Sequence, residues 1–240
     1  MRSPVGIPDL PRGTLRRAYD LMRAAQGHQD WWPGDGPFEV CIGAILTQNT
    51  SWRNVEQALD RLKTCDLLSP QALHGVPADR LAELLRPAGC PSVKARRVRA
   101  FVDLLMNGFE GSLRRLFAGD RTAVRARLLE VPGIGPETAD SMLLYAGGHR
   151  SFVVDAYLRR VMERHGWAGP RASYDALQSC CEAQLSGEDA RGYEPLDLWQ
   201  DFHAQVVAVG KTWCQARGPR CKGCPLEPLL PARGTVGSGA

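Results

Sequence analysis

Residues 128–140 of this 240-residue chain read LLEVPGIGPETAD, a short turn between two stretches in which apolar residues recur at helical spacing. Gly133 and Gly135 have no Cβ, so the backbone of the turn can adopt positive φ and approach another surface closely. Pro136 suits the first position of a helix, and the first amides of a helix attract anions. The segment predicts a hairpin that binds a phosphate. The alternative is an ordinary turn between two helices, where Gly and Pro are also common.

Helical periodicity extends on both sides of this turn, and the alternation typical of strands is nearly absent. Residues 38–46 are apolar nearly all round, which predicts a helix buried at the centre of a bundle. The other apolar faces are Val55/Ala58/Leu59/Leu62, Val98/Phe101/Val102/Leu105, Tyr174/Leu177/Cys181/Leu185 and Phe202/Val206/Val209. Clusters of Pro and Gly separate these segments. We expect an all-α protein.

Composition restricts the protein's class only loosely. The formal net charge of +4 and a pI near 8.7 permit a phosphate-binding face but do not demonstrate one. No apolar run approaches the roughly 20 residues that span a bilayer, and residues 1–20 lack the apolar core of a signal peptide. We therefore expect a cytoplasmic protein that is not bound to a membrane. The last ten residues, 231–240, are small, polar or turn-forming and predict a flexible tail.

A carboxylate follows the hairpin at a fixed distance. Residues 152–157 read FVVDAY, and Asp155 lies 18 residues after Glu137. Taken alone, a carboxylate after three apolar residues is typical of a helix N-cap. Together, the hairpin and Asp155 resemble the endonuclease III superfamily of helix-hairpin-helix DNA glycosylases.

This resemblance implies a helical fold of two lobes with damaged double-stranded DNA as the partner, and we expect a monomer. One lobe would span about 37–146 and end in the helix-hairpin-helix at about 123–146. The other would combine 1–36 with 147–230. The hairpin would bind a DNA phosphate through residues that include Gly133, Gly135 and Thr138.

The resemblance also assigns the chemistry. Asp155 would be the catalytic residue, because a fixed carboxylate stabilises the positive charge that develops on the sugar and can orient or deprotonate the attacking water. Members of the superfamily that also cleave the strand attack the sugar with a lysine of the hairpin helix. Glu137 occupies the matching position, and a glutamate cannot form that imine. We therefore expect a monofunctional glycosylase that hydrolyses the bond between the base and the sugar and leaves the DNA strand intact.

Further segments resemble one branch of the superfamily, 3-methyladenine DNA glycosylase III. They are the Trp-Trp-Pro of 31–33, the Thr-Gln-Asn-Thr of 47–50 and the Phe-His-Ala of 202–204. The match covers roughly residues 31–225. It implies an alkylated purine as substrate, and such a base is cationic and attracted to electron-rich rings.

In this branch Trp52 would stack on the extruded base. The other residues that the resemblance places at the substrate are Trp31, Trp32, Pro33, Glu137 and Lys211. Tryptophans beside a central helix are also commonly packing residues. A charged lysine would repel a cationic base, so Lys211 would have to be deprotonated, modified or paired, for example with Glu137, or would instead contact a phosphate.

Two more positions are candidate DNA contacts. Gln48 resembles the glutamine that other members insert into the gap left by the flipped base, although it follows an apolar helix and could also be a C-cap. Lys94 belongs to a basic run, with Arg96, Arg97 and Arg99, that could follow the DNA backbone. The alternative for this run is a solvated helix face.

Eight cysteines fall into two groups. Five are scattered among apolar residues, where cysteine is usually a small buried hydrophobe. Cys214, Cys221 and Cys224 match the first three ligands of the superfamily's [4Fe–4S] loop, but Leu230 occupies the fourth position. Three interpretations stay open: a cluster with an open or non-cysteine site on one iron, a zinc site completed by another residue, or no metal.

The sequence thus favours a DNA base-excision repair glycosylase that releases alkylated purines such as 3-methyladenine. One alternative is an endonuclease III-like glycosylase/lyase for oxidised pyrimidines or mismatched bases. Another is a catalytically silent helix-hairpin-helix DNA-binding protein.

Overall fold

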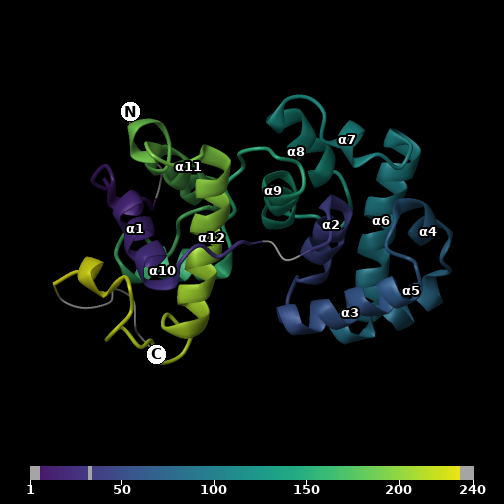
Figure 1. The fold of residues 1–240 in the computed structure, drawn as a ribbon, viewed down its shortest axis with the longest axis horizontal. Coiled ribbons are helices and arrows are strands. Elements are labelled where there is room, and N and C mark those ends of the chain that lie inside the picture. Colours follow the sequence, from purple (N-terminus) through teal and green to yellow (C-terminus); the bar gives the residue numbers. More distant parts are fainter. Residues whose placement is uncertain (1–5, 32–33, 233–240) are drawn as a thin grey trace. The chain divides into compact units, whose positions relative to one another are not determined.

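The computed structural model describes residues 6–31 and 34–232, and the regular secondary structure in these ranges consists of helices joined by loops (Figure 1). No β-strand occurs in them, so the all-α prediction is confirmed. The helices are α1 (Thr14–Gln26), α2 (Pro37–Leu46), α3 (Trp52–Thr64), α4 (Pro70–Gly75), α5 (Ala78–Leu84), α6 (Pro91–Phe109), α7 (Leu113–Leu116), α8 (Arg121–Leu129), α9 (Pro136–Tyr145), α10 (Ala156–Arg164), α11 (Tyr174–Gln184) and α12 (Pro195–Thr212), with short 3₁₀ turns at Arg86–Ala88, Gly187–Ala190 and Glu227–Leu229. Trp32, Pro33 and residues 233–240 of the expected tail lie outside the described residues.

The chain divides into two compact units. We call Trp32–Ser151 the hairpin unit, and Met1–Trp31 with Phe152–Ala240 the aspartate unit. The sequence placed the divisions after residues 36 and 146. The second division falls later because residues 147–151 pack on the hairpin unit. In this segment the His149 ring contacts the Phe117 carbonyl at 2.8 Å, and the Ser151 hydroxyl donates to Asp140 at 2.5 Å.

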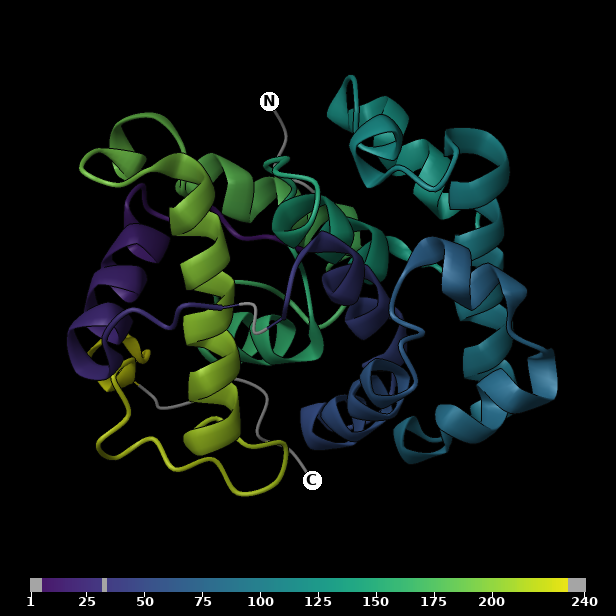
Figure 2. The ribbon, with the colours of Figure 1, turned by 45° about the vertical axis from the view of Figure 1, so that its right-hand side comes forward.

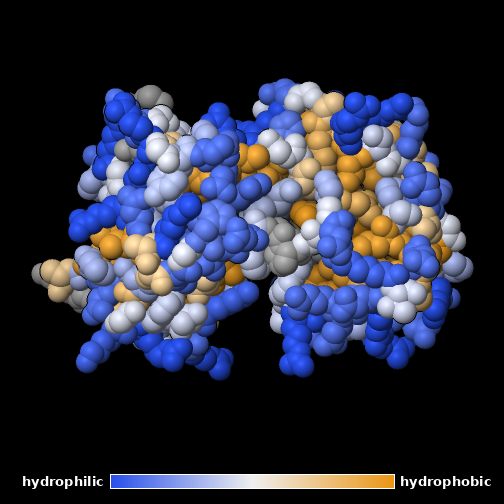
Figure 3. Space-filling view, viewed as in Figure 1, coloured by the Kyte–Doolittle hydropathy of each residue, from blue (hydrophilic) through white to orange (hydrophobic). Residues whose placement is uncertain are grey.

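In the hairpin unit, α2 packs against α3, α6 and α9. Figure 2 shows the same ribbon turned by 45°. All residues of α2 from Glu39 to Leu46 are buried, as the nearly continuous apolar run predicts. The faces predicted for α3 and α6 also lie in this core. Hydrophilic residues cover much of the surface seen in Figure 3, and apolar residues gather in patches on the hairpin unit. Leu129 is the only large hydrophobic residue in the described ranges that is classed as exposed.

The aspartate unit is built around α12, which packs against α1 and α10. Aromatic rings fill its core: Phe202 stacks with Tyr19 at a centroid distance of 6.2 Å and meets Phe152 edge-on at 5.7 Å. Phe152 is fully buried in this core and is the first residue after the division between the units. Among the described residues, no helix is both long and apolar enough to cross a membrane.

Candidate functional site

The hairpin of residues 130–135 joins α8 to α9, and α9 begins at Pro136 as predicted. Gly133 adopts φ 90°, a conformation that favours glycine, and a Cβ there would collide with the side chain of Arg97. Both the backbone and the packing therefore require glycine at this position.

Gly135 is different, because nothing in the described part of the chain requires glycine there. It is the N-cap of α9 with φ −96° and ψ 179°, an extended conformation that other residues adopt readily. A Cβ built on Gly135 would meet no atom within 4 Å. The missing side chain instead leaves open the approach to the first amides of α9, which carry the positive end of the helix dipole. This is the geometry of an anion site.

A buried ion pair holds the two hairpin helices together. Arg125 of α8 donates from Nε and Nη2 to the two carboxylate oxygens of Asp140 on α9, at 2.8 and 3.0 Å. The Asp140 side chain is fully buried, and Ser151 donates a further hydrogen bond to it. This pair was not predicted from the sequence. An aspartate within an apolar helix was the available signal, since a buried charge needs a partner.

Gln48 is tied to the hairpin. Its Nε2 donates to the Gly133 carbonyl at 3.0 Å and to the Thr138 hydroxyl at 2.9 Å, and its Oε1 accepts from Arg97. The C-cap of α2 is Thr47, so Gln48 does not have that role. The Thr138 side chain is buried against Gln48, which leaves only the backbone of Thr138 for a phosphate contact.

The structure contradicts the prediction that Lys94 contacts the DNA backbone. It is only 3% exposed, and its ammonium donates to the carbonyls of Leu46 at 2.8 Å and Gln48 at 2.6 Å. Burial, reinforced by the charge of Arg97, lowers the pKa of Lys94 to about 8. A lysine that satisfies the carbonyls at the end of α2 is not available to a DNA phosphate. In the same run Arg99 also donates to backbone carbonyls, whereas Arg96 is exposed.

Trp52 and Glu137 lie on the hairpin unit. Trp52 is the first residue of α3 and packs, partly buried, against the core, while its indole N–H donates to Glu56 at 2.8 Å. Trp52 is therefore a packing residue of the core, and its stacking on an extruded base stays a prediction. Glu137 is exposed in the first turn of α9, beside the open N-terminus described above.

Asp155 is held rigidly at the start of α10. It is the N-cap, and its Oδ1 accepts a hydrogen bond from the Leu158 amide at 2.7 Å, as the local sequence predicts. Its side chain is 11% exposed. The other oxygen, Oδ2, lies 3.6 Å from Nε2 of His203. One carboxylate oxygen thus fixes the side chain, and the other faces an imidazole.

His203 was not among our candidate residues, although it stands in the Phe-His-Ala segment that the sequence analysis singled out. It lies on α12 and is buried. His203, Val207 and Lys211 are four residues apart and so share one face of the helix. Farther along α12, a Cβ on Gly210 would collide with the Tyr157 ring, so glycine there allows α10 to pack closely.

Lys211 is exposed, and its ammonium lies 5.4 Å from the centroid of the Trp31 ring, a cation–π distance. The segment that leads to Trp31 is anchored on α12: the Gln29 amide donates to Asp201 at 2.8 Å, and His28 contacts Asp197 at 3.0 Å. Burial lowers the pKa of His28, but the hydrogen bond to Asp197 and the charge of Asp201 outweigh it and raise the pKa overall.

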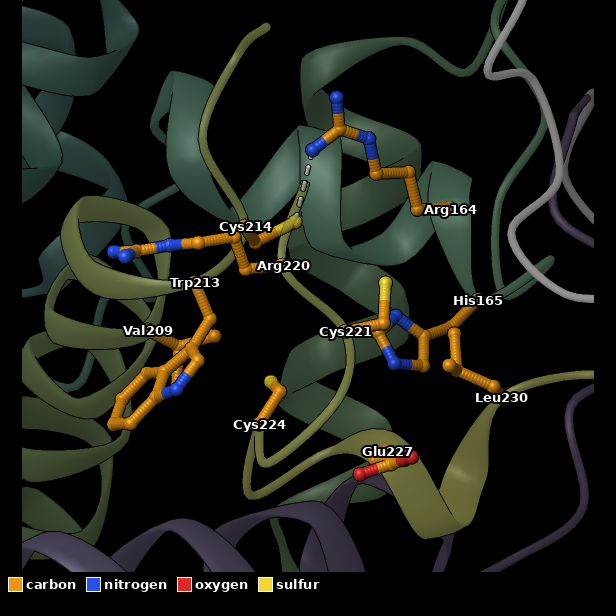
Figure 4. A pocket seen from close by; sticks show the side chains of 10 residues that line it. All are labelled: Arg164, His165, Val209, Trp213, Cys214, Arg220, Cys221, Cys224, Glu227 and Leu230. Atoms are coloured by element: carbon orange, nitrogen blue, oxygen red, sulfur yellow. Dashed lines mark hydrogen bonds between the residues drawn. The ribbon is translucent and has the colours of Figure 1, made fainter. Parts of the chain in front are cut away.

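Cys214, Cys221 and Cys224 line one cavity beside the end of α10, together with Leu230 (Figure 4). None of the three forms a disulfide, and Arg164 donates to the Cys214 sulfur at 3.3 Å. Burial raises the pKa of the Cys224 thiol, and the two neighbouring cysteines raise it further. In the described part of the chain, no three His, Cys, Asp or Glu side chains are close enough to hold a single metal ion.

Comparisons with known proteins agree with this geometry. A family model described as "HhH-GPD superfamily base excision DNA repair protein" matches residues 42–185. A protein of Methanocaldococcus jannaschii described as a candidate DNA repair glycosylase, MJ1434, is 38% identical over 215 residues, which cover 89% of this chain and 94% of that protein.

Two solved structures extend the comparison. A non-covalent endonuclease III–DNA complex matches with a TM-score of 0.73 at 23% identity and covers 92% of this chain and 95% of that one. H. pylori 3-methyladenine DNA glycosylase (MagIII), bound to 1,N6-ethenoadenine, matches with a TM-score of 0.68 at 25% identity, over 81% of this chain and 97% of that one. The family model covers more than half of the chain, and these relatives confirm the resemblance that its motifs carry. The chain belongs to the HhH-GPD superfamily of base excision DNA repair proteins.

Proposed function

We propose that the protein is a monofunctional DNA glycosylase that hydrolyses the N-glycosidic bond of alkylated purines, such as 3-methyladenine, in damaged double-stranded DNA. The observation that carries the proposal is the fixed carboxylate of Asp155, with one oxygen at the N-terminus of α10 and the other beside His203. The proposed enzyme acts as a monomer.

Asp155 has the properties that this hydrolysis needs. Cleavage of the bond builds positive charge on the sugar, and a carboxylate held in place stabilises that charge without reorganising. The Leu158 amide, in the first turn of α10, holds Oδ1 of Asp155 in place. Its Oδ2 is the oxygen available to the sugar or to the attacking water, and His203 is a positioning residue that limits the orientation of this oxygen.

Glu137 supports hydrolysis without strand cleavage. Cleavage through an imine needs an amine nucleophile beside the sugar, and the hairpin helix presents a carboxylate at the matching position. The abasic site is then the product. Incubation with borohydride and damaged DNA tests this point, because a covalent adduct formed in good yield would contradict it.

Two tryptophans support a cationic base as substrate. Trp31 already attracts the ammonium of Lys211 to its ring face, and a cationic purine could take the place of that ammonium. Trp52 presents a second ring at the start of α3. MagIII, one of the structural relatives, is a 3-methyladenine DNA glycosylase. Base release from duplexes with 3-methyladenine, thymine glycol or a G·T mismatch, measured separately from strand cleavage, tests the substrate. Release of thymine glycol with strand cleavage would instead support the endonuclease III-like alternative.

We also propose that the protein binds a [4Fe–4S] cluster at the cysteine loop, residues 214–224. Its three thiols are soft donors that line one cavity, and Arg164 and Arg220 line it too, so that they would offset the negative charge of a cluster. The cluster, when bound, would hold the loop in place and is assigned no chemical step. Iron and sulfide analysis after anaerobic purification tests its presence.

A further inference from the structure

The cysteine cavity lacks a fourth thiol. Each iron of a [4Fe–4S] cluster takes a ligand from the protein, and three cysteines account for three irons. Leu230 lines the cavity at the position of the fourth ligand, but its side chain has no donor atom. A histidine from another element, His165, lines the same cavity (Figure 4).

His165 is buried beside the cavity, and its ring nitrogens face two backbone carbonyls. It is the C-cap of α10 and is 8% exposed. Both ring nitrogens face backbone carbonyls, and the contact of Nδ1 with the Val161 carbonyl, at 2.9 Å, is the shorter one, which favours the tautomer with the proton on Nδ1 and a lone pair on Nε2. Nε2 lies 3.4 Å from the Leu226 carbonyl, which cannot donate to that lone pair. Histidine ligands commonly donate their other N–H to a backbone carbonyl in this way.

Contacts of the neighbouring residues hold the His165 ring beside the cysteine loop. Arg164, the preceding residue, donates to the Cys214 sulfur and to the carbonyl of Gln215 at 2.7 Å, so the end of α10 is attached to the cysteine loop. On the other side, the Trp167 ring lies 4.6 Å from the imidazole, centroid to centroid, at an interplanar angle of 33°. The position of His165 is thus determined by contacts within the protein.

Glu227 is a weaker candidate for the fourth ligand. It also lines the cavity, but it is exposed, and its Oε2 accepts a hydrogen bond from the Gly223 amide at 2.8 Å. A carboxylate is also a harder donor than an imidazole, and iron–sulfur centres are known with histidine in place of cysteine.

We propose that His165 is the fourth protein ligand of the cluster and replaces the thiol that Leu230 cannot supply. The inference rests on the proposed cluster, not on the proposed substrate. Exchange of a thiolate for a neutral imidazole makes the centre less negative, so we expect a higher reduction potential than that of a four-cysteine variant.

The experiment compares the wild type with His165→Ala, Leu230→Cys and the double variant, all purified anaerobically. We expect about four irons per chain in the wild type, loss of at least one iron in His165→Ala, and recovery in the double variant. Pulsed EPR of the reduced wild type should show coupling to imidazole nitrogen, and the double variant should lack it. The Leu230→Cys chain should keep its iron.

The outcomes separate the proposals. A wild type without iron would refute both the cluster and the role of His165. A His165→Ala chain that keeps the wild-type iron content and nitrogen coupling would refute the role of His165 alone. Circular dichroism checks folding, and if His165→Ala does not fold, His165→Cys should fold with its iron and without the nitrogen coupling. Release of 3-methyladenine by the wild type is measured in parallel and tests the glycosylase independently.

Discussion

Replacement of Gly135 by alanine should weaken DNA binding without weakening the fold. Alanine at a backbone conformation it can adopt stabilises a chain by about 0.4–1 kcal/mol. Alanine is a poorer N-cap than glycine, at a cost of up to about 1 kcal/mol. A Cβ at Gly135 meets no atom of the described residues within 4 Å, so packing adds nothing, and the two effects offset each other. The free energy of unfolding should stay close to that of the wild type.

Binding should respond much more strongly. The new methyl group would occupy the approach to the first amides of α9, and a hydrogen bond to a charged group contributes about 1.5–3 kcal/mol. Loss of one phosphate contact therefore corresponds to roughly a 10- to 150-fold increase in Kd. Fluorescence anisotropy with an undamaged duplex at one fixed salt concentration measures this change, because the phosphate contact does not depend on the lesion.

Gly133→Ala is the matched control in the same turn. Its φ of 90° and the collision with Arg97 predict destabilisation by about 1–3 kcal/mol. Urea unfolding of both variants should therefore separate them clearly. If Gly135→Ala bound duplex DNA as tightly as the wild type, the open N-terminus of α9 would not be a phosphate site and our reasoning would be refuted.

Four further changes test the remaining geometry. Asp155→Asn should abolish release of 3-methyladenine while DNA binding stays intact, and surviving activity would contradict the proposed mechanism. His203→Gln should lower kcat several-fold with little change in KM, because it removes the ring that lies 3.6 Å from Oδ2 of Asp155; an unchanged kcat and pH profile would exclude a positioning role. Asp140→Ala should destabilise the chain by about 3 kcal/mol, because it leaves the partly buried Arg125 without its carboxylate, and a urea midpoint equal to that of the wild type would disprove this. The raised pKa of His28 predicts a contribution to stability that is full below the pKa of the unfolded histidine and is lost as pH rises through the higher folded value; urea unfolding of His28→Gln between about pH 5 and pH 9 should lack this loss.

Several features could be predicted because their causes are local. The start of α9 at Pro136 follows from residue types within one turn of chain. The hydrogen bond that holds Asp155 spans three residues, so an aspartate ahead of a helix was enough to predict it. The buried state of α2 follows from an apolar run without a polar face.

Other features could not be predicted because their partners are distant in the chain. Lys94 looked like part of an exposed basic face, yet its ammonium reaches carbonyls nearly 50 residues away. Gln48 meets Thr138 across 90 positions. Helical periodicity identifies the face that a helix buries, but it does not identify the helix that covers that face. A polar residue on a mixed face therefore looks the same whether it points to water or to a buried partner.

The hairpin and the site residues around it show what the sequence determines and what the tertiary structure determines. The sequence by itself determined that residues 128–140 turn between two helices and that a carboxylate begins the helix after them, because turns and caps depend on neighbouring residues. Only the tertiary structure decided that Gly133 is required by Arg97 while Gly135 is open, that His203 faces Asp155, and that His165 shares the cavity of the three cysteines. These contacts depend on the packing of whole helices, which brings together residues that no local pattern connects.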